Sequence, residues 1–250
     1  MKYLYTGIVF CIAFGFYMIK KAFENNLVTH HIKLDDTDME RPLKILFISD
    51  IHRRKIPEKW FSSLPDVDLV LIGGDITEKG VPYDRIAHNA ALLSSAGDTY
   101  FVYGNNDEEV NKEKLGTLLK EKGINILEND AEVLQSHSNI VIAGIGDINY
   151  QKDDLQHTLG MIGDQKVILL SHDPRVTKKM KQVAEAEKVK LVLCGHTHGG
   201  QIRIFGFGPY QKGRLTKTAK FTKLVSNGYG TTVIPMRLGA KPEVHLIQID

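Results

Sequence analysis

The stretch "LKILFISDIH", residues 43–52, joins a nearly continuous apolar run to an aspartate and a histidine directly behind it. Such a run is typical of a β-strand that is buried on both faces. Similar runs follow at residues 68–74, 99–104, 139–146, 166–172 and 189–195. Helical patterns lie between several of them, at residues 83–95, 111–122 and 174–186. Alternating strands and helices predict an α/β fold.

The C-terminal part of the chain lacks helical patterns. Residues 221–239 and 242–249 resemble strands that are joined by turns. The predicted architecture is therefore mixed, with two packed sheets and helices outside them. We expect this domain to span residues 41–250.

Composition excludes some classes of protein. The chain has 250 residues, 42% of them hydrophobic and 25% charged, which is ordinary for a globular protein. Its formal net charge of +2 gives no strong basic field, so nucleic acid is not the expected ligand. Two cysteines, Cys11 and Cys194, cannot form a disulfide framework, and Cys194 lies in an apolar run that favours a place in the core.

The N-terminal segment is uncharged from residue 3 to residue 19, "YLYTGIVFCIAFGFYMI". A helix of this length reaches roughly 25 Å, at the short end of what crosses a bilayer. We predict that residues 1–22 form a single-pass anchor in the cell membrane. A buried core helix is disfavoured because every face is apolar, and a cleaved signal peptide because no A-x-A-like site follows. The balance of flanking lysines leans towards a cytoplasmic C-terminal domain, but the side of the membrane stays open.

The segment between anchor and domain, residues 23–40, is mostly polar. It is predicted to be a tether, with a first strand at residues 29–34.

Polar residues follow five of the apolar runs at the point where each run ends. They are Asp50 and His52, Asp75, Asn105 to Asp107, His172 with Asp173, and His196 with His198. Each alone could be a turn residue, a helix cap or a surface histidine. In open α/β sheets, however, ligands bind beyond the carboxyl ends of the strands. A cluster at five strand ends is better explained by metal binding.

The expected ligands are histidine nitrogens with carboxylate and amide oxygens, without thiolate. This set suits Mn²⁺, Fe, Zn²⁺ or Mg²⁺, of which we favour Mn²⁺. There are more candidate ligands than one ion needs. Two divalent ions that share a carboxylate are therefore predicted, and paired ions are a device for phosphoester hydrolysis.

The order of these motifs resembles the calcineurin-like metallophosphoesterases from about Arg41 to the end of the chain. The segment "GHTHGGQIRI" and the C-terminal tail are similar to a membrane-associated branch that includes hydrolases of UDP-diacylglucosamine. The resemblance implies a four-layer α/β/β/α sandwich and attack on phosphorus between two ions. It implies that the first metal is held by Asp50, His52 and His198, the second by Asn105, His172 and His196, and that Asp75 bridges them.

One position departs from that family pattern. Many members have a histidine where this chain has Asn106, and that histidine can protonate the leaving group. An amide can hydrogen-bond a phosphate oxygen but cannot act as a general acid near neutral pH. Asn105, Asn106 and Asp107 are the expected catalytic residues, with Asp107 orienting Asn106 or capping the next helix. We therefore expect pyrophosphate or activated diester substrates rather than alkyl monoesters, unless another residue such as His88, His137 or His157 supplies the proton.

Arginine side chains could contact the substrate phosphate, because a guanidinium offers two donors to it. Arg53 directly follows the first metal motif, and Arg237 lies in the C-terminal tail. Together with Asn106 they are the expected substrate-binding residues. A solvated charge is the alternative for Arg53.

The sequence thus predicts a membrane-anchored, metal-dependent phosphohydrolase that acts on a phosphorylated small molecule or a lipid-linked or sugar-nucleotide substrate. The alternatives are a non-catalytic metal-binding scaffold of the same fold, or a nuclease or phosphatase of the same superfamily. No protein partner is evident.

Overall fold

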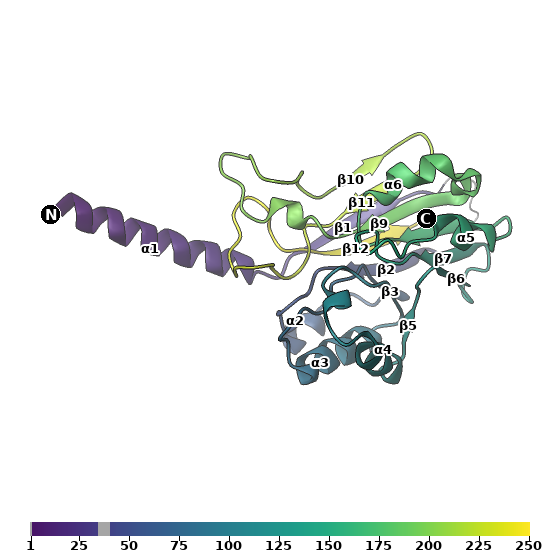
Figure 1. The fold of residues 1–250 in the computed structure, drawn as a ribbon, viewed down its shortest axis with the longest axis horizontal. Coiled ribbons are helices and arrows are strands. Elements are labelled where there is room, and N and C mark those ends of the chain that lie inside the picture. The colour runs from purple at the N-terminus through teal and green to yellow at the C-terminus, as the bar shows by residue number, and fades with distance from the viewer. Residues whose placement is uncertain (1, 35–40) are drawn as a thin grey trace.

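The structure is a computed structural model that describes residues 2–34 and 41–250 (Figure 1). Its strands form two six-stranded sheets. The first sheet has the order β1 (Leu27–Ile32), β12 (Val244–Ile249), β2 (Leu43–Ile48), β3 (Leu69–Ile72), β4 (Asp98–Phe101) and β5 (Ile124–Ile126). The second has the order β10 (Arg214–Lys217), β11 (Thr222–Val225), β9 (Val189–Cys194), β8 (Lys166–Leu170), β7 (Ile140–Gly144) and β6 (Asp130–Val133).

Both sheets are mixed. Strands β2 to β5 run parallel to one another, whereas β12 is antiparallel to β2 and parallel to β1. In the second sheet β7, β8, β9 and β11 are parallel, and the two edge strands β6 and β10 are antiparallel. Strands β3 and β7 are buried along their whole length, as their continuous apolar sequences predict.

Three hydrophobic clusters show how the layers pack. The central cluster joins residues of both sheets, among them Phe47, Leu71, Ile168 and Leu193. A second cluster packs the first sheet against α3 (Tyr83–Ser94) and α4 (Lys112–Glu121). A third packs the other sheet against α5 (Leu155–Gly160) and α6 (Val176–Lys179). The predicted four-layer α/β/β/α sandwich is confirmed.

Local details differ from the sequence-based expectation. The helix expected at residues 174–186 is interrupted: α6 is followed by 3₁₀ turns at Met180–Gln182 and Ala184–Lys188. The interruption falls at Val183, whose extended backbone (φ −117°, ψ 119°) cannot continue a helix. The short helices α5 and α2 (Glu58–Phe61) were not predicted. Of residues 221–239, the only part within a named strand is β11.

The N-terminal helix α1 (Lys2–Ala22) projects from the domain (Figure 1). Residues 3–22 are long and apolar enough to cross a membrane, and only 6% of their most apolar stretch is buried in this structure. Its last turns contact the domain, where Met18 and Ala22 are buried. The backbone N–H of Arg237 donates to the Met18 carbonyl at 3.0 Å.

The expected tether contains part of the first sheet. Strand β1 lies two residues nearer the N-terminus than the strand expected at residues 29–34, and it pairs with β12. Residues 35–40 of the expected tether lie outside the described residues.

Candidate metal centre

The structure brings the seven expected metal ligands to one place. They follow β2 (Asp50, His52), β3 (Asp75), β8 (His172) and β9 (His196, His198), and Asn105 follows β4 by a short loop. Strands of both sheets thus deliver their C-terminal ends to the same rim of the sandwich, as expected for a ligand site of an α/β fold.

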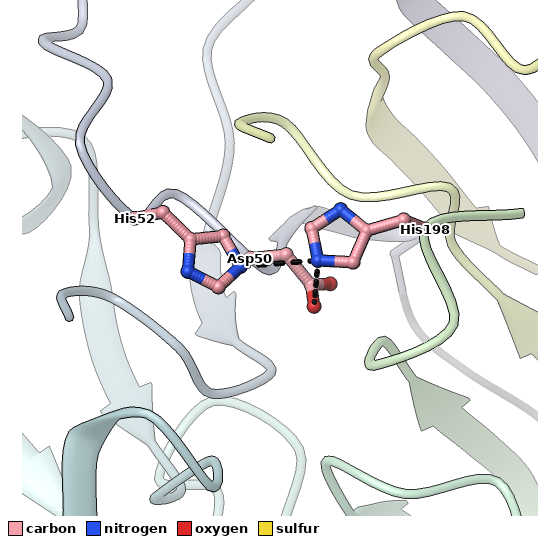
Figure 2. A group of neighbouring side chains, drawn as sticks. All are labelled: Asp50, His52 and His198. Atoms are coloured by element: carbon pink, nitrogen blue, oxygen red, sulfur yellow. Dashed lines mark hydrogen bonds and ion pairs between the residues drawn. The ribbon is translucent and has the colours of Figure 1, made fainter. Parts of the chain in front are cut away.

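The first group consists of Asp50, His52 and His198 (Figure 2). The Nε2 atoms of His52 and His198 are 3.0 Å apart, and His198 Nε2 is 3.4 Å from Asp50 Oδ1. All three side chains are buried.

The second group consists of Asp75, Asn105, His172 and His196. Asn105 Oδ1 is 2.8 Å from His196 Nδ1 and 3.2 Å from His172 Nε2. Asp75 Oδ2 is 3.3 Å from His172 Nε2 and 3.7 Å from His52 Nε2. One oxygen of Asp75 therefore lies near a histidine nitrogen of each group.

These residues fit divalent metal ions. The Nε2 atoms of His52 and His198 face each other at 3.0 Å, and without an ion one of them donates a hydrogen bond to the other. Both nitrogens could instead bind one ion through their lone pairs, because Zn–N bonds of about 2.0–2.1 Å suit nitrogens that are this close. The mixed nitrogen and oxygen donors match the chemistry of Mn²⁺, Fe or Zn²⁺.

Backbone strain is concentrated at the same residues. Five of the seven have a left-handed backbone with φ between 49° and 71°: Asp50, His52, Asp75, His196 and His198. Each such residue costs of order 1–2 kcal/mol unless it is glycine. The fold therefore accepts several strained positions to turn these side chains towards one point.

Two glycines permit the close approach of backbone to the carboxylates. A Cβ at Gly104 would collide with Asp75 Oδ1, and a Cβ at Gly195 would collide with Asp50 Oδ2. Any larger residue at either position would push a candidate ligand away.

Glu78 is a residue of the site that sequence reasoning missed. Its Oε2 lies 3.1 Å from His52 Nδ1, within ion-pair distance, while Nε2 of the same ring faces His198 in the first group. In the second group, His172 Nδ1 donates to the Gly73 carbonyl at 2.8 Å, which leaves Nε2 free for a metal. Such outer partners fix the tautomer of metal-bound histidines. The sequence signal for Glu78 is slight: an acid three residues after Asp75.

Burial and charge set the protonation of the histidines. Burial lowers the pKa of His198 to about 3, against the opposing effect of the Asp50 carboxylate, so this ring is neutral. Burial also opposes protonation of His172, but the carboxylates of Asp75 and Asp50 outweigh it and raise its pKa. A positive group is thus favoured beside these carboxylates, as a bound cation would be.

Asp107 does not have the expected role. It is fully buried and accepts hydrogen bonds from the backbone N–H groups of Asp75 (2.6 Å), Gly104 (2.9 Å) and Thr77 (3.1 Å). It neither contacts Asn106 through a hydrogen bond nor caps α4, whose N-cap is Asn111. Burial and then the Asp75 carboxylate raise the pKa of Asp107 to about 8. Asp107 holds two strand-end loops together.

Asn106 contacts the shared carboxylate. Its side-chain amide donates to Asp75 Oδ2 at 2.7 Å, and its backbone N–H donates to Asp75 Oδ1 at 2.8 Å. Asn106 also lines the cavity beside the two groups.

The expectation that Arg237 contacts substrate is wrong for this structure. Arg237 is 0% exposed, and its guanidinium donates to the backbone carbonyls of His198, Asn227, Gly228, Gly230 and Ala240. Burial lowers its pKa to about 10. Its function is to hold the chain around His198.

Arg53 lies in a neighbouring hollow. Its exposed guanidinium contacts Glu78 and the carbonyl of Lys79, and it lines a separate cavity of about 290 Å³ next to the end of α1. The structure does not place it among the residues that line the cavity of the metal groups.

That cavity has a volume of about 480 Å³ and begins at Asp75, Asn105, His196 and His198. Its lining also includes Thr197, Gln201 and Thr232 and five largely apolar residues, which are Ile202, Pro209, Tyr210, Val233 and Ile234. None of the described residues His88, His137 and His157 lines it. The chemistry of the cavity therefore changes from charged at its base to apolar at its mouth.

Comparison with known proteins agrees with this arrangement. The profile of the calcineurin-like phosphoesterase family matches residues 43–200. The chain is 40% identical over 239 residues to the protein YpbG of Bacillus subtilis (strain 168), covering 93% of this chain and 90% of the relative. It is 28% identical over 233 residues to phosphodiesterase YaeI of Escherichia coli (strain K12), covering 85% of this chain and 84% of that protein.

Solved structures share the fold at low identity. The 5′-nucleotidase precursor from Thermus thermophilus matches with a TM-score of 0.52 and 13% sequence identity. NAD nucleotidase from Haemophilus influenzae matches with a TM-score of 0.50 and 19% sequence identity. These matches cover 83% and 76% of this chain but only 55% and 45% of the two larger proteins.

Proposed function

Because the chain belongs to the calcineurin-like phosphoesterase family, we propose that it is a membrane-anchored hydrolase with two metal ions that cleaves a phosphodiester or pyrophosphate bond. Membership of this family makes the chain a metal-dependent phosphoesterase, and we propose a phosphorylated small molecule as its substrate. The two ions, the anchor and the type of bond are our proposal.

The observation that carries the proposal is the position of Asp75 between two groups of donors. Its Oδ2 lies within 3.7 Å of a histidine nitrogen of each group. One ion would be held by Asp50, His52 and His198, the other by Asn105, His172 and His196, with Asp75 shared. When bound, such ions supply Lewis acidity towards a phosphoryl group and lower the pKa of water.

The side chains of the protein have separate tasks in this reaction. The histidine and carboxylate ligands hold the site in a buried rim, where charge interactions are stronger than in water. Asn106 faces the cavity and can hydrogen-bond a phosphate oxygen through its amide. It cannot protonate a leaving group, so expulsion of a stable anion is favoured over expulsion of an alkoxide. This supports a pyrophosphate or an activated diester as substrate.

The apolar mouth of the cavity and the N-terminal helix support a lipid-linked substrate. Ile202, Val233 and Ile234 line the same cavity as Asp75, so a phosphate at the metal groups would have its substituent against apolar side chains. Helix α1 would keep the protein at the membrane. The name of the E. coli relative, a phosphodiesterase, agrees with cleavage of a diester.

The substitution Asp75→Asn tests the proposal. It keeps the shape of the side chain but removes the shared charge, so turnover of bis-p-nitrophenyl phosphate should fall by more than about 100-fold, the upper range for loss of an outer metal partner. Metal content per chain should fall with it. Asp130→Asn, an exposed aspartate at the start of β6, is the matched control. Full turnover by a folded Asp75→Asn protein would refute the proposal.

A further inference from the structure

An apolar surface lies beside the cavity, which three of its residues, Tyr210, Val233 and Ile234, also line. Six exposed apolar residues form it, from the loop between β9 and β10 and the loop between β11 and β12: Ile204, Phe205, Phe207, Tyr210, Val233 and Ile234. We call this set the apolar rim. Phe205 is 97% exposed and Val233 is 95% exposed. Single exposed apolar residues are common, but a group of large ones next to a site marks an interaction surface.

The first loop of the apolar rim is an ordered hairpin. Ile204 and Phe207 exchange two backbone hydrogen bonds of 2.9 Å, which places Phe205 and Gly206 at the tip. Arg203 donates to the carbonyls of Gly199, Gly206 and Tyr210 and so holds the base of the hairpin. The aromatic side chains are therefore presented by a fixed backbone.

Two residues of the apolar rim have backbones that would suit glycine. Phe205 has φ 51° and Val233 has φ 63°. A β-branched residue in this region is a clear outlier, and glycine or asparagine would relieve the backbone strain at each position. These positions combine backbone strain with full exposure of an apolar side chain, a combination that folding alone does not explain.

The two loops contact each other and the end of α1. The Gln201 side chain donates to the carbonyls of Thr232 and Ile234 at 3.1 Å and so joins them. Val233 and Ile234 line a hollow together with Ala22 and Phe23, which lie at the end of the helix. In Figure 1 the loops lie on the side of the domain from which α1 projects.

The length of α1 brings this side of the domain to the membrane. Its last turn contacts the domain from Met18 onward, and the fifteen residues 3–17 lie before this contact. They span about 22 Å, whereas the hydrocarbon core is about 30 Å thick. A spanning α1 therefore draws the surface around its end about 8 Å into the membrane boundary. Val233 and Ile234 of the apolar rim lie there, beside Ala22 and Phe23.

Charge agrees with this placement. Residues 188–242, which contain both loops, include ten lysines and arginines and no aspartate or glutamate. No carboxylate of this segment has to be dehydrated at a bilayer surface, and anionic headgroups attract basic residues that lie near them.

We propose that the apolar rim inserts into the interface of a phospholipid bilayer, so that the cavity of the metal groups opens onto the membrane surface. This inference rests on the proposed anchor and goes beyond it, because a helix on a flexible link would leave the cavity free to face any direction. Substrate would enter from the plane of the membrane, with its apolar part along Ile202 and Val233.

A fluorescence experiment on the full-length protein in vesicles tests this inference. Trp60, the one tryptophan of the chain, is replaced by phenylalanine, and a reporter is introduced as Phe205→Trp. The control reporter is Met161→Trp, at a residue that is 51% exposed at the end of α5. Vesicles of phosphatidylcholine and phosphatidylglycerol carry bromine on the acyl chains and quench only tryptophans that reach them. Phe207→Trp is a second reporter in case the first variant does not fold.

We expect brominated lipid to reduce the emission of Phe205→Trp at least twofold and to leave Met161→Trp unchanged. Equal emission changes at the two positions, or none at either in protein that floats with the vesicles, would overturn the insertion and leave the anchor intact. Protein that does not float with vesicles would overturn both. Turnover of bis-p-nitrophenyl phosphate, measured separately in detergent, tests the proposed hydrolase independently of these outcomes.

Discussion

Glu78 provides a quantitative test of how the site is held together. Its carboxylate contacts His52 Nδ1 at 3.1 Å, and no other described residue forms an ion pair with that nitrogen. Loss of an outer partner of a metal-bound histidine typically costs 10–100-fold in metal affinity. Glu78→Gln keeps an acceptor and loses only the charge, so we expect about 10-fold weaker binding. Glu78→Ala loses both the acceptor and the charge, and we expect metal binding to be about 100-fold weaker, or roughly 2.7 kcal/mol less favourable.

The assay is calorimetric titration of metal-free protein with Mn²⁺, with circular dichroism to check folding. Arg53→Ala is the matched control, because it breaks the contact between Arg53 and Glu78 but keeps the contact to His52. We expect its metal affinity to remain within about twofold of the wild-type value. If Glu78→Ala binds Mn²⁺ as tightly as the wild type, Glu78 does not position His52. If Arg53→Ala weakens Mn²⁺ binding as much as Glu78→Ala does, the loss of affinity comes from the ion pair between Arg53 and Glu78 and not from the contact with His52.

Three further predictions concern stability. Deletion of residues 1–40 removes β1, whereas deletion of residues 1–21 keeps it. The Tm of the shorter protein, measured by calorimetry, should be at least about 5 °C lower. Equal Tm values would show that β1 does not stabilise the domain. Burial, and then the charge of His245, lower the pKa of His30 to about 4. The unfolded chain therefore binds more protons than the folded one between pH 6.5 and 4, and the free energy of unfolding should decrease as the pH is lowered through this window. Urea unfolding of His30→Gln should show a smaller decrease over the same pH range. Arg237→Lys should lower the free energy of unfolding by about 3 kcal/mol. If this variant is as stable as the wild type but has a raised KM, Arg237 binds substrate and the structural role is wrong.

The sequence predicts most of the metal centre because of one geometric rule. Each of Asp50, Asp75, His172 and His196 directly follows or closely follows a buried strand, and parallel strands deliver their ends to one rim. The continuous apolar runs mark the strands, so the positions of these residues follow from the chain alone. Two sheets that pack face to face then bring the two sets of strand ends together.

Other features depend on long-range contacts that no local pattern encodes. Glu78 reaches His52 because the loop after β3 returns to the loop after β2, and a single acid in a loop does not predict this. An arginine in a C-terminal loop would normally be exposed, but the carbonyls of five residues surround Arg237. Asp107 resembles the partner of a catalytic group by its place in the sequence, whereas its backbone contacts show a structural role.

The number of metal ions that activity requires tests the central proposal most directly. Metal-free, full-length protein in detergent is titrated with Mn²⁺ while turnover of bis-p-nitrophenyl phosphate and bound metal per chain are measured in the same samples. With Asp75 shared by two groups of donors, we predict that turnover rises to its maximum only as the second equivalent binds. Maximal turnover at one equivalent, or turnover in excess chelator, would contradict the two-metal site.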